Sequence, residues 1–408
     1  MGETVIEKII RNNVGKTVKP GDIVTVNVDR VMIHDIFIPF VAEKFEEMGF
    51  TKLWDPDKVV LIYDHLVPAS QLDDTRHFHA GDAFAKKYGM KNVHRSDGIC
   101  HQLMTEAGYV KPGNIVFGTD SHTTTYGCVG AFSSGIGYTE MASILGTGTM
   151  WIKVPETIKV VVDGELPENV MSKDIILRLI GDLGADGATY RALEFTGSTV
   201  KNMTVASRMT MANMAIEAGA KCALFTPDEK TAEYCGIELN DFQKSLSGDT
   251  DATYIKTITY RAEDFVPVMA CPSQVDKIRD VSDLEGTEID QVFIGSCTNG
   301  RLEDLKAAAE VLKGKKVAKY VKLIVTPASR KIYRQAIDMG IMDVLAEAGA
   351  IITHPGCGLC CGRTGGILTD GERVVATNNR NFLGRMGTSK VEIYLASPKT
   401  AAACAVHR

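Results

Sequence analysis

The stretch VVLIYDH, residues 59–65, is a nearly continuous apolar run that ends in Asp64 and His65. Strands that are buried on both faces of a parallel sheet have this composition, whereas half-buried strands alternate apolar and polar residues. In α/β proteins, functional groups gather at the carboxyl ends of such strands. The stretch therefore predicts a buried parallel strand that delivers an acid and a histidine to a site.

Two further stretches repeat this design. NIVFGTDSH, residues 114–122, follows a short apolar strand with Asp120, Ser121 and His122, and QVFIGSCTN carries Cys297 just beyond its apolar run. Since several strands end in polar residues, we expect an α/β fold with mostly parallel sheets whose strand ends converge on one cleft.

The length of 408 residues corresponds to about two to three domains. Composition changes near 156–170, where a new strand and turn begin, and over 273–290, which is charged and poor in apolar residues. We therefore predict three α/β domains, over 1–154, 155–284 and 285–408.

Composition also excludes several classes of protein. The net charge of −6 argues against a nucleic-acid partner, and no run approaches the roughly 20 apolar residues that span a membrane. The N-terminal stretch MGETVIEKIIRNN has no apolar core, so a secretory signal is not expected. Ten cysteines without such a signal indicate a reducing compartment, and we expect a cytoplasmic protein.

Two short segments, IGSCTNG and HPGCGLCCG, supply three candidate thiolate ligands: Cys297, Cys357 and Cys360. A metal site with three protein ligands leaves one coordination position open for water or substrate. Sulfur ligation suits either zinc or an iron–sulfur cluster. The thiols therefore predict a metal centre with an open position.

The CxxC spacing by itself also fits a redox dithiol or half of a zinc knuckle. A knuckle needs a second close pair, whereas Cys297 stands alone, and Pro355 with its neighbouring glycines favours a loop over a redox helix start. Glycine-rich loops suit a cluster, so a cluster is favoured and zinc stays open. Cys361 is expected to be packed, because adjacent residues rarely both face one metal.

A second set of residues can move protons. It consists of acids and histidines near strand ends or in loops: Asp64, His65, His101, Asp120, His122 and Glu194. A histidine whose other nitrogen faces a carboxylate has a fixed tautomer and a stabilised imidazolium. Such pairs would serve proton transfer to a leaving hydroxyl, although each could also be a satisfied buried contact.

A third set lies in the loop NRNFLGR, residues 379–385. Arg380 and Arg385 flank a glycine turn, and two guanidinium groups so placed can hold carboxylates. A salt-bridge network within the loop is the alternative.

The segments GTDSHT, IGSCTNGR, PGCGLCCG and NNRNFLGR together resemble the aconitase superfamily, in order and over essentially the whole chain. The length resembles the large subunits of two-component members: 3-isopropylmalate dehydratase, homoaconitase and 2,3-dimethylmalate dehydratase. The resemblance implies three α/β domains around a cluster-containing cleft, without the fourth, swivelling domain of the single-chain aconitases.

The resemblance also implies a cofactor. One [4Fe–4S] cluster would be held by Cys297, Cys357 and Cys360, with one iron lacking a protein ligand. That iron would act as a Lewis acid on a substrate hydroxyl and one carboxylate. The histidine–carboxylate pairs around the hydroxyl would then be Asp64/His65, His101/Asp120 and His122/Glu194.

The remaining site residues follow from the same resemblance. Arg380 and Arg385 would bind a substrate carboxylate or organise their loop, and Asn299 and Asn379 would lie near the cluster. His34 occupies a position where the aconitases have a glutamine that touches substrate. Ser121 belongs with this substrate-binding group.

The implied activity is the reversible dehydration or isomerisation of a malate-type 2-hydroxy acid, with 3-isopropylmalate as the leading substrate. The family takes its catalytic serine from the swivelling domain, so the chain is expected to need a small partner subunit that supplies it. The substrate would be a small di- or tricarboxylate, with no nucleic-acid or membrane partner. CGLC in place of the common CGPC keeps the dimethylmalate branch open, and a zinc scaffold or a cluster-sensing RNA-binding regulator is the remote alternative.

Overall fold

The computed structural model describes residues 2–407. Its first sheet has the strand order β4-β3-β2-β5-β6, with all neighbours parallel. The strands are β2 (Arg30–His34), β3 (Val59–Tyr63), β4 (Asn92–Arg95), β5 (Ile115–Gly118) and β6 (Phe132–Gly135). The expected strand over 59–65 is thus β3, and Asp64 and His65 follow its last residue.

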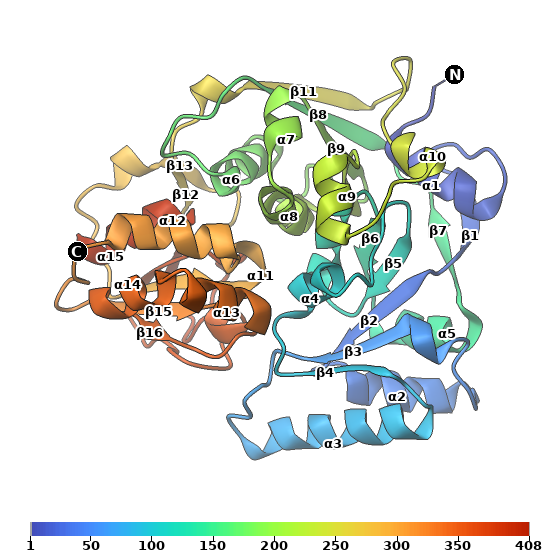
Figure 1. Ribbon diagram of the computed structural model, residues 1–408, viewed down its shortest axis with the longest axis horizontal. Helices are drawn as coiled ribbons and strands as arrows, with labels where there is room; N and C mark the ends of the chain where they lie inside the picture. The colour runs from blue at the N-terminus through green and yellow to red at the C-terminus, as the bar shows by residue number, and fades with distance from the viewer. Residues whose placement is uncertain (1, 408) are drawn as a thin grey trace.

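Helices cover both faces of this sheet. They are α1 (Val5–Val14), α2 (Ile38–Glu47), α3 (Leu72–Lys87), α4 (Cys100–Glu106) and α5 (Tyr138–Thr147). Figure 1 shows α2 and α3 side by side below the sheet and α4 above it, toward the rest of the molecule. Strands β1 (Ile23–Asn27) and β7 (Thr149–Lys153) form a separate antiparallel ribbon.

The second sheet is parallel, with the order β10-β9-β8-β11. Its strands are β8 (Thr157–Asp163), β9 (Ala192–Thr196), β10 (Cys222–Phe225) and β11 (Lys256–Arg261). The helices of this part are α6 (Ser172–Leu183), α7 (Ser198–Asn202), α8 (Val205–Met214), α9 (Glu229–Cys235) and α10 (Asp241–Lys244).

The third sheet has the order β13-β12-β18-β17-β14-β15-β16. Its parallel part contains β14 (Gln291–Gly295), β15 (Lys322–Thr326), β16 (Ile351–Ile352), β17 (Arg373–Ala376) and β18 (Glu392–Leu395). At one end of the sheet, β12 (Val268–Ala270) is antiparallel to both of its neighbours, β18 and the edge strand β13 (Ile278–Asp280). The helices are α11 (Ser296–Asn299), α12 (Leu302–Leu312), α13 (Arg330–Asp338), α14 (Ile341–Ala348) and α15 (Pro398–Val406).

The predicted α/β class with mostly parallel sheets is therefore confirmed. The change from the first sheet to the second falls between β7 and β8, whereas β12 and β13 join the third sheet although they precede residue 285. The charged stretch 273–290 accordingly contains an edge strand. One apolar core includes residues of all three sheets, among them Met32, Ile158 and Val292. The division into three domains stays a prediction.

Within residues 2–407, none of the helices combines the length and the apolar character needed to cross a bilayer.

The first and third sheets meet at the carboxyl ends of their strands. The amide of Cys357 donates to the carbonyl of Asp64 at 3.0 Å, and the amide of Ile99 donates to the carbonyl of Ala328 at 2.9 Å. Because these bonds join main chain to main chain, they hold the two edges at a defined separation. The polar residues that follow the strands are thereby enclosed between the sheets.

A close approach at Gly127 joins the first part of the chain to the second sheet. A Cβ at Gly127 would lie 1.5 Å from the carbonyl oxygen of Ala223 in β10. We predict that Gly127→Ala lowers the stability by about 1–3 kcal/mol, because a buried backbone must move. The urea midpoint of folded protein measures this. Gly137→Ala is the control, because its Cβ would meet the flexible side chain of Glu140. Equal midpoints for the two variants would contradict the prediction.

Candidate active site

The three candidate thiol ligands lie on the third-sheet side of the region enclosed between the sheets. Cys297 is in α11, directly after β14, while Cys357 and Cys360 follow β16, at the start of and within the 3₁₀ helix Gly358–Cys361. All three are buried. The turn into α11 depends on Gly295, which has φ +154° and whose Cβ would lie 2.5 Å from the carbonyl oxygen of Thr326. This turn directs the next residues from the strand end into the cleft.

Hydrogen-bond donors surround the sulfur atoms. Asn213 Nδ2 and Asn379 Nδ2 donate to Cys297 Sγ at 3.3 and 3.5 Å, and Arg385 Nη2 donates to Cys360 Sγ at 3.7 Å. The hydrogen bond with Cys357, together with the charge of Arg385, holds the pKa of Cys360 well below its usual range. Burial raises the pKa of Cys297 to about 12, so this thiol needs a metal to become a thiolate.

The surroundings of the three sulfurs test the fit of an iron–sulfur cluster. Among the described residues the three sulfurs do not all lie within 4.8 Å of one another, although Cys357 and Cys360 are close enough to hydrogen-bond. The amide and guanidinium donors directed at Cys297 and Cys360 suit the thiolates of a cluster. The donor set therefore fits an iron–sulfur cluster.

Across the cleft, Asp64 and His65 form a buried pair. His65 Nδ1 lies 2.7 Å from Asp64 Oδ1, and Asp64 Oδ2 accepts from the amide of Cys100 at 2.7 Å. Burial alone would lower the pKa of His65, but the charge and hydrogen bond of Asp64 outweigh burial and hold this pKa well above its usual value. The pair is an imidazolium and a carboxylate, and Nε2 of His65 remains available as a proton donor.

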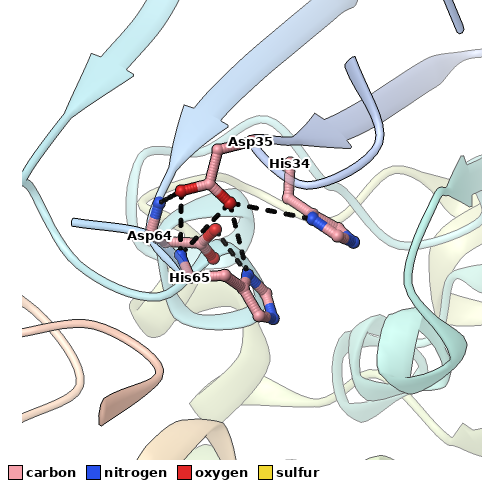
Figure 2. Close-up of side chains that lie close together, drawn as sticks. All are labelled: His34, Asp35, Asp64 and His65. Carbon is pink, nitrogen blue, oxygen red and sulfur yellow. Dashed lines mark hydrogen bonds and ion pairs between the residues drawn. The ribbon is translucent and has the colours of Figure 1, made fainter. Parts of the chain in front are cut away.

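Asp35 fixes this pair and was not anticipated from the sequence. Its carboxylate accepts from the amides of Asp64, His65 and Leu66 at 3.0, 3.1 and 2.8 Å. Figure 2 shows Asp35 between His34 and the turn that carries Asp64 and His65. The turn is therefore built around one buried carboxylate. In the sequence, Asp35 is the second polar residue after the apolar run of RVMIHD, and this position is the signal that could have identified it.

The ring of His34 is buried against this pair without a side-chain hydrogen bond. Its ring stacks on that of His65 at 4.4 Å between centroids, and neither ring nitrogen has a hydrogen-bond partner among the described residues. The nitrogens lie 3.9 Å from carboxylate oxygens of Asp35 and Asp120. A buried polar group in this state is available to a ligand.

Asp120 joins two further histidines. Its Oδ1 lies 2.9 Å from His101 Nε2 and 3.2 Å from His122 Nδ1. Burial would raise the pKa of Asp120, but its interactions with His101 and His122 hold it well below its usual range. Burial lowers the pKa of His101. His101 is thus a neutral base beside a carboxylate, in contrast to the charged His65.

The expected pairing of His122 with Glu194 is wrong. His122 Nε2 lies 2.7 Å from Glu217 Oε1, in the 3₁₀ helix after α8. Glu194, in β9, instead accepts from the amide of Val5 at 3.0 Å and from the hydroxyl of Tyr254 at 2.7 Å. Its carboxylate is used to anchor the start of α1. Both hydrogen bonds of His122 raise its pKa, against the effects of burial and of Arg380.

Arg380 joins Glu217 to Ser121. Its Nε donates to Glu217 Oε1 at 2.8 Å, and its Nη2 donates to Ser121 Oγ at 2.9 Å. The structure therefore brings Ser121 and Arg380 together beside His122. Arg385 lies against Cys360 instead, and its Nε is buried without a partner among residues 2–407.

Sequence reasoning missed Asn213 and Glu217 as well as Asp35. Asn213 contacts Cys297 Sγ, and Glu217 contacts both His122 and Arg380. The two are four residues apart in the otherwise apolar stretch MANMAIEAGA, residues 211–220. Polar residues at that spacing share one face of a helix, which is the signal that could have identified them.

Fold and site together define an α/β protein with a buried thiol centre ringed by histidine–carboxylate pairs. The family profile described as Aconitase family (aconitate hydratase) matches residues 7–407. The chain therefore belongs to the aconitase family.

Individual relatives match the chain over its full length. The chain is 47% identical over 407 residues to a protein of Methanopyrus kandleri named 3-isopropylmalate dehydratase large subunit 1, with 100% of this chain and 97% of the relative covered. It is 45% identical over 408 residues, with the same coverage, to a protein of Methanothermobacter thermautotrophicus named probable 3-isopropylmalate dehydratase large subunit.

Among solved structures, the holo-form of Thermococcus kodakaraensis aconitase X is similar, with a TM-score of 0.52 and 14% identity. The alignment covers 88% of this chain and 84% of the other. At this identity the likeness concerns the fold alone.

The two glutamates can be distinguished by titration. We predict that Glu217→Gln lowers the pKa of His122, because the lost anion favoured the imidazolium and the proton then leaves at lower pH. Nuclear magnetic resonance of the cluster-free chain with labelled histidine measures this, with the signal assigned through His122→Gln. Glu194→Gln is the matched control and should leave the pKa of His122 unchanged. If Glu194→Gln lowered the pKa of His122 and Glu217→Gln did not, the pairing of His122 with Glu194 would be supported instead.

Proposed function

We propose that the chain is the large subunit of a [4Fe–4S] hydro-lyase that reversibly dehydrates a malate-type 2-hydroxy dicarboxylic acid, with 3-isopropylmalate as the substrate. The observation that carries this is the meeting of three buried thiols with the histidine–carboxylate pairs in one cleft. The names of the relatives support the choice of substrate.

In this proposal Cys297, Cys357 and Cys360 hold one cluster. Such a cluster, when bound, supplies a Lewis-acidic iron without a protein ligand for a substrate hydroxyl. Asn213, Asn379 and Arg385 stabilise the thiolates through the hydrogen bonds that they already donate to sulfur.

The histidines divide the proton transfer between them. His65, held as an imidazolium by Asp64, donates a proton to the departing hydroxyl. His101, which burial keeps neutral, accepts or relays a proton with Asp120. Opposite protonation states within one site are what a reversible addition and removal of water requires.

Substrate carboxylates would be bound by side chains with free hydrogen-bonding capacity. Arg385 Nε and both ring nitrogens of His34 are buried and without partners among the described residues. Arg380, oriented by Glu217 and Ser121, offers its remaining guanidinium donors. A dicarboxylate would supply the acceptors that these groups lack.

We further propose that a small partner subunit supplies the swivelling domain and the serine that removes the proton next to the substrate carboxylate. The designation of the relatives as large subunits supports this partner. No nucleic-acid or membrane partner is part of the proposal. The ten cysteines are all free, which suits a reducing cytoplasm.

Ligand assignment is tested by comparing two cysteines. We predict that Cys297→Ser loses most of its iron, because a three-thiolate site loses one ligand. Cys361→Ser should retain most of its iron, since the Cys361 sulfur contacts the backbone carbonyls of His65 and Gly358 at 4.0 and 3.8 Å. Iron per chain and visible absorbance after anaerobic reconstitution measure both. Equal iron in the two variants would refute the assignment.

The substrate and the partner are tested in one anaerobic hydration assay. The reconstituted chain is given isopropylmaleate, citraconate, dimethylmaleate or cis-aconitate, with and without the small subunit. We expect hydration of isopropylmaleate only when both chains are present. Turnover by this chain alone would mean that the base lies within it, and exclusive turnover of dimethylmaleate would move the substrate to that branch.

A further inference from the structure

Lys173 is a fully buried lysine behind the thiol loops. It is the second residue of α6, and its side chain has no exposed surface. Its Nζ donates to the carbonyls of Thr377 and Asn378 at 2.6 and 2.7 Å and to Asn299 Oδ1 at 3.2 Å. All three hydrogen bonds of the ammonium group are therefore made to neutral oxygens.

The charge of this lysine has no carboxylate at ion-pair distance among residues 2–407. The charges of Asp304 and Asp174 act on Lys173 from farther away, and burial outweighs them and lowers the pKa of Lys173 to about 7. The neighbouring acids are engaged elsewhere, because Asp174 accepts from the amides of Met171 and Val268, and Asp304 accepts from Asn299 and the amide of Arg301. A buried ammonium in this state is costly unless an anion lies near it.

The acceptors of Lys173 belong to the two segments that surround the sulfurs. Asn299 is two residues beyond Cys297 and in the same short helix, α11. Asn378 precedes Asn379, whose side chain contacts the sulfurs of both Cys297 and Cys360. The N-terminus of α6 adds the positive end of a helix dipole at the same place. Figure 1 shows α6 between the second sheet and β12, and its contacts include both α8 and β12.

We propose that Lys173 is a positioning residue for the iron–sulfur cluster: it is the buried counter-charge of the anionic cluster, and it holds Asn299 and the loop at 377–379 around the thiolates. This inference rests on the cluster of the proposed function. Lys173 acts through the charge of its ammonium and through its three acceptors, without contact to substrate. A cluster with three thiolate ligands is the anion that this buried cation lacks.

A purely structural tie between α6 and the third sheet is the competing explanation. Lys8 provides a matched example of such a tie, since its Nζ donates to the carbonyls of Ser245 and Ser247 and to Asp249 Oδ1 at 3.1, 2.7 and 2.6 Å. Lys8 is also buried, and Figure 1 shows α1 and α10 far from α11. Removal of either lysine removes two bonds to carbonyls, but only Lys173 lies beside the thiol loops.

The test is an anaerobic redox titration of reconstituted wild-type, Lys173→Met, Lys173→Arg and Lys8→Met chains, followed by electron paramagnetic resonance. The wild type must first show a cluster, and its failure to do so would count against the proposed function instead. We expect Lys173→Met to lower the midpoint potential, because a nearby cation favours the more negative, reduced cluster. Iron loss to a chelator should be at least about threefold faster in this variant. Lys173→Arg and Lys8→Met should stay close to wild type in potential.

A wild-type potential and iron-loss rate in Lys173→Met would overturn the inference. The inference would also be overturned if Lys173→Met and Lys8→Met lost equal stability as cluster-free chains and neither variant changed the midpoint potential or the rate of iron loss. If Lys173→Met does not fold, Lys173→Gln takes its place, because its amide keeps one donor for a carbonyl and still removes the charge. The midpoint potential and the rate of iron loss of Lys173→Gln then test the inference in the same way.

Discussion

The arrangement of the site depends on two parallel sheets whose carboxyl edges face each other at a separation set by backbone hydrogen bonds. The bond from the amide of Cys357 to the carbonyl of Asp64 is the central one, because it joins the thiol loop to the turn that carries the first histidine–carboxylate pair. In both sheets polar residues follow the carboxyl ends of the parallel strands, so each edge contributes polar groups. Opposed edges therefore enclose these groups between them, in a place from which water is largely excluded.

Burial makes every charge in this place depend on its neighbours. Asp120 is hydrogen-bonded to His101 and His122, and Glu217 to His122 and Arg380, so each carboxylate is shared between two side chains. The two histidines end in unequal states, because His65 is held charged by its own acid while burial keeps His101 neutral. Removal of one carboxylate would leave two groups unbalanced, which is why single substitutions here should affect protonation well beyond the altered residue.

Local pattern sufficed for the buried strands and for the polar residues at their ends, while two of the three histidine–carboxylate pairs implied by the family resemblance are present. An apolar run such as the one before Asp64 identifies a buried strand. The residues that follow the run, such as Asp120 or Cys297, are then placed at the end of that strand, because both inferences use only one segment of the sequence. The partner of His122 could not be found in this way. Glu194 lies on a strand and Glu217 beyond a helix, and only the packing of α8 on the 3₁₀ helix Ser121–Val129 decides between them. Asp35 was missed for a related reason, since its bonds to three amides depend on how β2 and β3 pair.

The polar atoms that remain unpaired limit the kind of ligand that this site can bind. His34 is buried with two ring nitrogens that have no hydrogen-bond partner among the described residues, and the same is true of Arg385 Nε. Each such atom costs about 1–3 kcal/mol, a cost that a bound acceptor or donor would offset. Arg385 can only donate, whereas a neutral His34 can donate from one ring nitrogen and accept at the other, so a carboxylate together with a hydroxyl satisfies these atoms. The proposed substrate class, a 2-hydroxy acid, has both groups on adjacent atoms.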